Sequence, residues 1–318
     1  MKIEDLHQEI EEAGGFVNAH AHLDRANTAH FFCKEDRHKE LKQKWLLVDE
    51  IKQRSSYRDY KERIIDALGE QSRKGVSYVC SFIDVDPVVS SKAIIAAREV
   101  TQLFSKPKLV IACQTLKGVL DQTPNMLIRN QLPHIDIIGS LPGADKGRES
   151  EHLDQIMQWG KEYNKRVHVH VDQLNTPEER ETEHLARKTI EWGMEGRVTA
   201  VHSISLACHP KSYRDEVYKV CKDAGLSFIS CPSAWIDHQR SETLMPFHNA
   251  ITPVDELIAN DFVVAIGSDN IHDVYKPYSD GDMMFELRML LESCKIYDKS
   301  VLVDIATKNG REVIGVEG

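Results

Sequence analysis

The sequence predicts an α/β fold, a (β/α)8 barrel of the TIM type, from three observations. Eight short apolar runs alternate with longer amphipathic runs along the 318 residues, as in parallel strands joined by right-handed helical crossovers. The short runs are β-branched or continuously apolar, which is typical of strands buried on both faces. Eight such units need roughly 250 residues, and the chain is long enough to hold them.

The expected strands follow the chain in order. They are GFVNAHAHL (15–23), VSYVCSFI (76–83), KLVIACQT (108–115), IDIIGSL (135–141), RVHVHVD (166–172), RVTAVHSI (197–204), LSFISCPS (226–233) and FVVAIGSD (262–269). The runs between them carry apolar residues at helical spacing. The expected helices span residues 57–75, 90–104, 150–164, 177–193, 212–225 and 281–295.

We expect residues 1–318 to form one barrel domain, because no repeat, low-complexity tract or linker interrupts this alternation. A doubly wound open sheet is the alternative, but the GxGxxG and GxxxxGK[ST] motifs of its nucleotide-binding members do not occur. Two long insertions, residues 24–55 and 233–253, follow the first and seventh strands. Barrel enzymes build their sites at this end of the strands, so both insertions are expected to be lid-like loops.

Composition restricts the partners of the protein. The formal charge is −10, which argues against non-specific nucleic-acid binding, since that needs a basic footprint. The start MKIEDLHQEIEEAGG is too polar for a secretory signal, and no apolar run approaches the roughly 18 residues of a membrane helix. The seven cysteines form no CxxC pair. We therefore expect a cytoplasmic protein with a small-molecule substrate, no nucleic acid and no membrane.

Histidines and one aspartate stand where four of the expected strands end. The first strand ends in His20-Ala21-His22, whose imidazoles share a face because residues two apart on a strand point the same way. The fifth ends at His170, the sixth at His202 and the eighth at Asp269. The carboxyl ends of barrel strands meet at one opening. Imidazoles and a carboxylate there suit one divalent transition metal, Zn²⁺ or Fe²⁺, whose bound water would ionise near neutral pH.

A single HxH pattern has little specificity, because ordinary hydrogen-bonded histidines produce it often. His168-Val169-His170 is such a case. We interpret His168 as a supporting residue one layer below the opening. The metal site is predicted because four strand ends together bring imidazoles and a carboxylate, and not because of any single histidine.

Four segments in this order, GFVNAHAHLD, VHVDQ, VTAVHSISL and GSDNIHD, resemble the amidohydrolase superfamily, in particular the cytosine deaminases and related ring deaminases. The similarity runs over about residues 15–315 and includes ACQTLKGVL and GMEGRVTAVHS. This resemblance implies a (β/α)8 barrel with one catalytic metal. The ligands it implies are His20, His22, His170 and Asp269.

The resemblance also assigns the remaining site residues. His202 would polarise the hydroxide or bond the tetrahedral adduct, and Gln114 matches a glutamine that contacts the pyrimidine in cytosine deaminase. The alternative for Gln114 is a loop residue that caps a strand. Asn270, beside the metal aspartate, and Gln173 are further candidates for substrate contact.

The sequence departs from this family in two respects. The first barrel strand begins near residue 15 and the chain stops at ATKNGREVIGVEG, so we expect the usual small β-sandwich to be absent, which leaves barrel surface that a homo-oligomer could cover. The deaminases also have a glutamate where this chain has Gln173. An amide cannot carry the protons of ring deamination. Asp269 could act as the base with His202 as the acid, whereas Asp172 would have to swing into the site.

The sequence thus predicts a metal-dependent hydrolase of a C–N bond in a small, polar, cyclic amide or amidine. The alternatives are a cytosine-type ring deaminase and a hydrolase of N-alkyl or halo triazine-like rings, whose better leaving groups need less acid assistance. A barrel that binds metal or ligand but has lost catalysis is the alternative of another class. The small zinc deaminases are excluded because their PCxxC motif does not occur.

Overall fold

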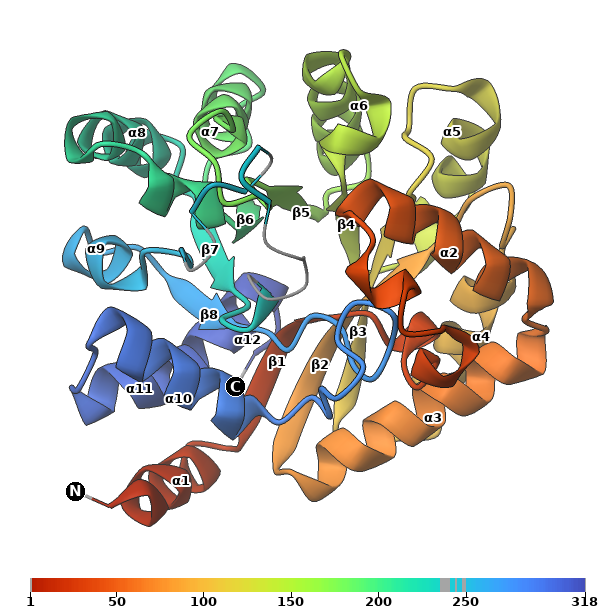
Figure 1. Ribbon diagram of the computed structural model, residues 1–318, viewed down its shortest axis with the longest axis horizontal. Helices are drawn as coiled ribbons and strands as arrows, with labels where there is room; N and C mark the ends of the chain where they lie inside the picture. The colour runs from red at the N-terminus through yellow and green to blue at the C-terminus, as the bar shows by residue number, and fades with distance from the viewer. Residues whose placement is uncertain (1, 235–240, 244, 248–249, 318) are drawn as a thin grey trace.

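Eight parallel strands form one sheet in the computed structural model, which describes residues 2–234, 241–243, 245–247 and 250–317 (Figure 1). The strands are β1 Phe16–Ala21, β2 Val76–Asp84, β3 Lys108–Gln114, β4 Ile137–Ser140, β5 Arg166–Val171, β6 Val198–His202, β7 Ser227–Ser230 and β8 Val264–Ile266. They pair in chain order from β1 to β8. A parallel bridge between Ala21 and Asp269 brings the last strand back to the first. The predicted (β/α)8 barrel is confirmed.

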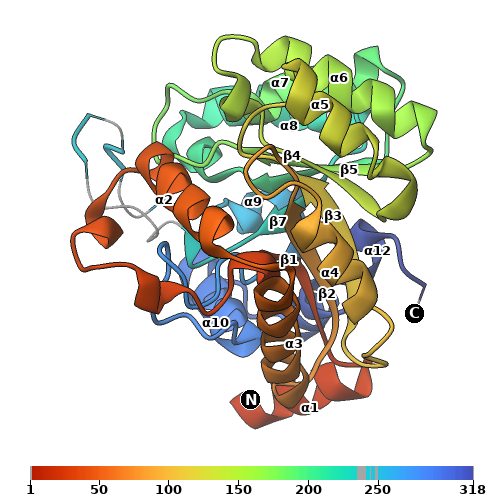
Figure 2. The same cartoon turned by 90° about the vertical axis from the view of Figure 1, so that its right-hand side faces the viewer.

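Most of the helices surround this sheet on its outer side (Figures 1 and 2). They are α1 Ile3–Glu12, α2 Leu41–Arg54, α3 Tyr57–Arg73, α4 Lys92–Val100, α5 Gln122–Arg129, α6 Glu149–Glu162, α7 Glu181–Glu191, α8 Lys211–Asp223, α9 Val254–Ala259, α10 Met283–Cys294, α11 Lys299–Ala306 and α12 Lys308–Ile314. All six predicted helices are present. Every helix among the described residues is too short or too polar to span a bilayer.

The strands bury side chains on both faces, as their apolar sequences predict. Along β3, Val110 and Ala112 belong to a cluster inside the barrel, whereas Ile111 and Cys113 pack outward against the helices. Val313 from α12 joins the inner cluster. This alternation directs every second side chain of a strand inward and fixes which polar residues can reach the opening.

The segment 24–55 differs from the loop that was expected. It contains α2, because Leu47, Val48 and Ile51 recur at helical spacing and bury themselves in a cluster with the loops after β3, β4 and β8. Figure 2 shows α2 apart from α3 and α4, which flank the strands. Part of the second expected lid, residues 233–253, lies outside the described residues, namely residues 235–240, 244, 248 and 249.

Candidate active site

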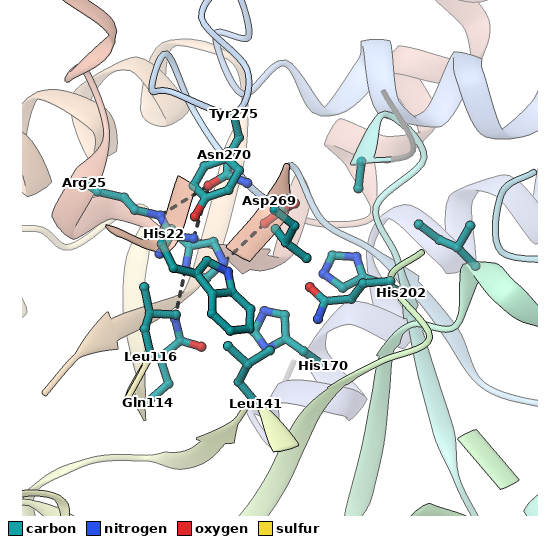
Figure 3. A pocket seen from close by; sticks show the side chains of 15 residues that line it. His22, Arg25, Gln114, Leu116, Leu141, His170, His202, Asp269, Asn270 and Tyr275 are labelled. Carbon is teal, nitrogen blue, oxygen red and sulfur yellow. Dashed lines mark hydrogen bonds and ion pairs between the residues drawn. The ribbon is translucent and has the colours of Figure 1, made fainter. Parts of the chain in front are cut away.

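The predicted polar residues come together at the carboxyl ends of the strands (Figure 3). His20 lies in β1 and His22 just after it, His170 lies in β5, His202 ends β6, and Asp269 follows β8. All five side chains are buried. His202 and Asp269 have positive φ angles of 78° and 57°, so the chain turns sharply where each strand ends. These turns point both side chains toward the opening instead of along the sheet.

The spacing of these groups matches the needs of a metal ion. Nε2 of His20 and Nε2 of His22 lie 3.3 and 3.2 Å from Asp269 Oδ1. The ligand atoms of His20, His22 and His170 lie within 4.8 Å of one another, as do those of His20, His202 and Asp269. Metal bonds of about 2.1 Å place tetrahedral ligand atoms roughly 3–4 Å apart. A single cation therefore fits among them.

The protonation states also suit a metal. Burial lowers the pKa of His20 and of His22 to about 4, and lowers that of His170 well below its usual value. Burial alone would raise the pKa of Asp269, but the neighbouring imidazoles of His20 and His22 hold it well below the usual value. Near neutral pH the site thus has imidazoles with free lone pairs and one ionised carboxylate, as metal ligands require.

Hydrogen bonds to carbonyl groups fix two of the histidines. His170 Nδ1 donates to the carbonyl of Ser140 at 3.0 Å, which leaves its Nε2 for a ligand role. His168 Nε2 donates to the carbonyl of Val313 at 2.9 Å, below the opening. Neither ring nitrogen of His20 has a well-directed hydrogen bond within the described part of the chain. A buried imidazole without such a partner fits the role of a metal ligand.

These groups form one side of a cavity that holds about 480 Å³ of space including its mouth. Its lining comprises His22, Arg25, Leu41, Trp45, Gln114, Leu116, Leu141, His170, Gln173, His202, Ile204, Ala234, Asp269, Asn270 and Tyr275. All three predicted substrate contacts, Gln114, Gln173 and Asn270, belong to this lining.

Asp172, the alternative proton carrier, is held at the start of α7. Its Oδ1 accepts from the Glu181 amide at 2.7 Å, and its Oδ2 accepts from the Thr182 hydroxyl at 2.6 Å. Burial raises the pKa of Asp172, but the group does not line the cavity. Swinging into the site would leave both of these donors unpaired.

Several cavity residues escaped the sequence analysis. Arg25 lies three residues after His22, and its Nε and Nη2 donate to Asn270 Oδ1 at 3.3 and 3.2 Å. Trp45 comes from α2, and Tyr275 from the loop after β8. Arg25 could have been predicted as a cavity residue, because it is a basic residue shortly after a barrel strand. Nothing comparable in the sequence marks Trp45 or Tyr275.

A buried ion-pair network lies beside the cavity. Lys52 of α2 lies 2.8 Å from Asp84 Oδ2 and 2.5 Å from Asp86 Oδ2, and all three side chains are buried. Asp84 in turn accepts from Gln114 Nε2 at 3.0 Å. The network ties α2 to the end of β2 and to the cavity wall.

Replacing Lys52 with methionine should destabilise the protein by about 3–5 kcal/mol, because it leaves the buried Asp86 carboxylate without its cation and Asp84 with only the more distant Arg25. Equilibrium unfolding in urea would measure the loss. Lys61→Met is the matched control, since Lys61 pairs with Glu99 on the surface, and it should cost under about 1 kcal/mol. Equal losses in the two variants would contradict a buried role for Lys52.

Known proteins are similar to this chain in sequence and in fold. Residues 58–315 match a family model described as the amidohydrolase family. An uncharacterised protein of Haemophilus influenzae is 43% identical over 258 residues, covering 80% of this chain and 94% of that protein. An N-isopropylammelide isopropyl amidohydrolase of a Pseudomonas species is 27% identical over 322 residues, covering 95% and 74%.

A solved structure superposes over the same barrel. The 5-methylcytosine deaminase from Klebsiella pneumoniae, liganded with 5-fluorocytosine, matches with a TM-score of 0.85 and 25% identity. The match covers 95% of this chain and 74% of the deaminase. The family match over residues 58–315 includes β5, β6 and β8 but not β1, whereas the structural match covers 95% of the chain.

Proposed function

We propose, from the premise that this chain belongs to the amidohydrolase family and is a hydrolase of C–N bonds, that it acts on a small, polar, cyclic amide or amidine. Members of this family are metal-dependent. The observation that carries the proposal is the buried group of imidazoles around Asp269 at the mouth of the barrel. We further propose that residues 1–318 form one barrel domain.

Four residues would hold one divalent transition metal: His20, His22, His170 and Asp269. Their nitrogen and oxygen donors suit both Zn²⁺ and Fe²⁺. When bound, the metal supplies Lewis acidity and makes a water acidic near neutral pH. The remaining chemistry belongs to side chains.

The side chains around the substrate have separate roles. Asp269 takes a proton from the attacking water through its carboxylate. His202 lies beside the same cluster, with ring centroids 5.4 Å from His20 and 5.3 Å from His170, and stabilises the charge that develops on the substrate. Gln114, Gln173 and Asn270 orient the ring by hydrogen bonds.

Two candidate reactions differ in their leaving group. Release of ammonia from an amino ring needs a strong proton donor, and the cavity has Gln173 where an acid would serve. Leu116, Leu141 and Ile204 give the cavity an apolar portion, which suits an N-alkyl substituent. Departure of an alkylamine needs a proton just as departure of ammonia does, whereas a halide leaves without one. The apolar portion of the cavity therefore favours an N-alkyl substrate, and the amide of Gln173 favours a halide leaving group, over cytosine-type deamination.

A panel of rings tests this proposal. Zinc- or iron-loaded protein should release alkylamine or a halide from substituted triazines or pyrimidinones, and metal-free protein should not. Amine release measured by mass spectrometry would report the reaction. A loaded protein that turns over no ring in the panel would favour the alternative of a barrel that has lost catalysis.

Gln114→Ala should lower kcat/KM by roughly 5- to 150-fold without changing metal content. The reason is that a buried donor or acceptor of the substrate would lose its partner, at a cost of roughly 1–3 kcal/mol. Steady-state kinetics and metal analysis of the same preparation would measure both quantities. Unchanged kinetics on the true substrate would return Gln114 to the role of a residue that caps β3.

A further inference from the structure

A buried chain of hydrogen bonds connects the helical layer with His170, one of the proposed metal ligands. Ser140 is the last residue of β4, and its carbonyl accepts from His170 Nδ1 at 3.0 Å. The Ser140 hydroxyl lies 2.8 Å from Nε2 of His152, which belongs to α6. Nδ1 of His152 lies 2.6 Å from Oδ2 of Asp145, in the turn after β4. Ser140 and His152 are both buried.

The Asp145 end of this chain is anchored and ionised. Its Oδ2 also accepts from the backbone amide of Val119, in the loop after β3, at 2.7 Å. Burial alone would raise the pKa of Asp145, but the hydrogen bonds from His152 and Val119 hold it below the usual value. A carboxylate can only accept, so Nδ1 of His152 donates to it. The ring is thereby fixed with Nε2 facing the Ser140 hydroxyl, which can donate or accept.

The three side chains do not form a second reaction centre. A serine, a histidine and an aspartate in this order resemble the triad of serine hydrolases, but a nucleophile must reach its substrate. None of the three residues lines the cavity, and the Ser140 hydroxyl is buried where α6 packs against β4 (Figure 1). The chain can therefore affect the proposed site only through the Ser140 carbonyl and His170.

The end of β4 needs this support because it is paired on one side only. β4 has four residues, and its pairing with β3 ends at Ile138. Ser140 pairs with β5 alone. On the side of α6, the hydrogen bond between the Ser140 hydroxyl and His152 holds the residue in place. A fixed Ser140 carbonyl in turn fixes the rotation of the His170 ring.

We propose that His152, Asp145 and the Ser140 hydroxyl are positioning groups that hold His170 in the orientation needed to bind a metal ion. They stand outside the ligand set and set its affinity through the Ser140 carbonyl. The inference rests on the metal site of the proposed function and adds the groups that preorganise it.

Ser140→Ala should weaken zinc binding about tenfold or more, the usual effect of losing a group that orients a metal ligand. The variant removes the hydroxyl but keeps the carbonyl that accepts from His170. Competition with a chromophoric zinc chelator would measure the dissociation constant. Ser227→Ala is the matched control, because the Ser227 hydroxyl bonds to Thr199 Oγ1 at 2.8 Å between β6 and β7 and touches no proposed ligand. It should bind zinc as the wild type does.

His152→Phe tests the more distant group. Phenylalanine fills a similar space but bonds to neither Ser140 nor Asp145, so zinc binding should again weaken about tenfold. If the two residues act in one chain, the double variant with Ser140→Ala should bind zinc no more weakly than the weaker single variant. Independent effects would multiply, and that result would overturn the inference.

Circular dichroism at the assay temperature would establish that each variant is folded. A purely structural role would lower thermal stability without changing zinc affinity, so wild-type affinity in folded Ser140→Ala protein would overturn the inference. Wild type that binds zinc and shows the Ser140 effect, but hydrolyses no ring, contradicts only the proposed reaction. Equal zinc binding by wild type and Ser140→Ala, with ring hydrolysis intact, contradicts only this inference. Wild type that binds no zinc contradicts both.

Discussion

Wild-type protein is expected to carry about one equivalent of a transition metal, and the double variant His20→Ala, His22→Ala less than about a tenth of that. Both imidazoles approach the same oxygen of Asp269, at 3.3 and 3.2 Å, so the double variant removes two adjacent donors at once. Elemental analysis by mass spectrometry after gel filtration would measure the content. The single variant His170→Ala should also lose most of the metal.

His168→Ala is the matched control for this experiment. His168 lies in the same strand as His170 and is equally buried, but its Nε2 donates to the Val313 carbonyl, below the opening. Its loss should leave metal content near the wild-type value and reduce stability, because that carbonyl loses its donor. Full metal occupancy in the double variant, or loss of metal in His168→Ala, would show that the ion is held elsewhere.

The sequence was sufficient to predict the barrel because its strands have an unusually clear pattern. β-branched runs such as RVHVHV cannot form amphipathic helices, and their regular alternation with helical runs leaves few topologies. The helices that escaped prediction include α2, which lies in a segment that was assigned to a loop, and several short helices. α9 has 6 residues and α12 has 7, too few for helical periodicity to be recognised. α12 forms because its apolar side chains close the barrel interior, a contact that local sequence does not encode.

The residues of the candidate site also fall into two groups, those that the sequence could predict and those that it could not. Residues at strand ends, such as His170 and Asp269, could be predicted because barrel topology alone brings them together. Residues that lie farther along the chain from the strand ends could not. Trp45 reaches the cavity only because α2 packs over the strand ends, and the buried pairing of Lys52 with Asp84 joins residues 32 positions apart. Such long-range pairs depend on packing and not on local pattern.

Gln173→Glu is expected to create ring deamination that the wild type performs poorly. Gln173 lines the cavity together with His170 and His202, and glutamate has nearly the same size, so packing should survive. A positioned acid–base group is typically worth about 10²–10⁴ in rate, because it can protonate both the ring nitrogen and the departing amine. Ammonia release from cytosine and isocytosine, at matched metal content, would measure the gain.

The carboxylates already present near Gln173 do not supply this function. Asp172 is committed to the start of α7, and Asp269 belongs to the proposed metal cluster. The new activity should therefore require both the metal and Asp269. It should fall with metal occupancy and vanish when Asp269→Ala is added to Gln173→Glu. A wild type that deaminates these rings at an ordinary rate would mean that another group carries the proton. A glutamate variant that loses its native reaction and gains no deamination would mean that Gln173 binds the substrate and that the cavity is built around its amide.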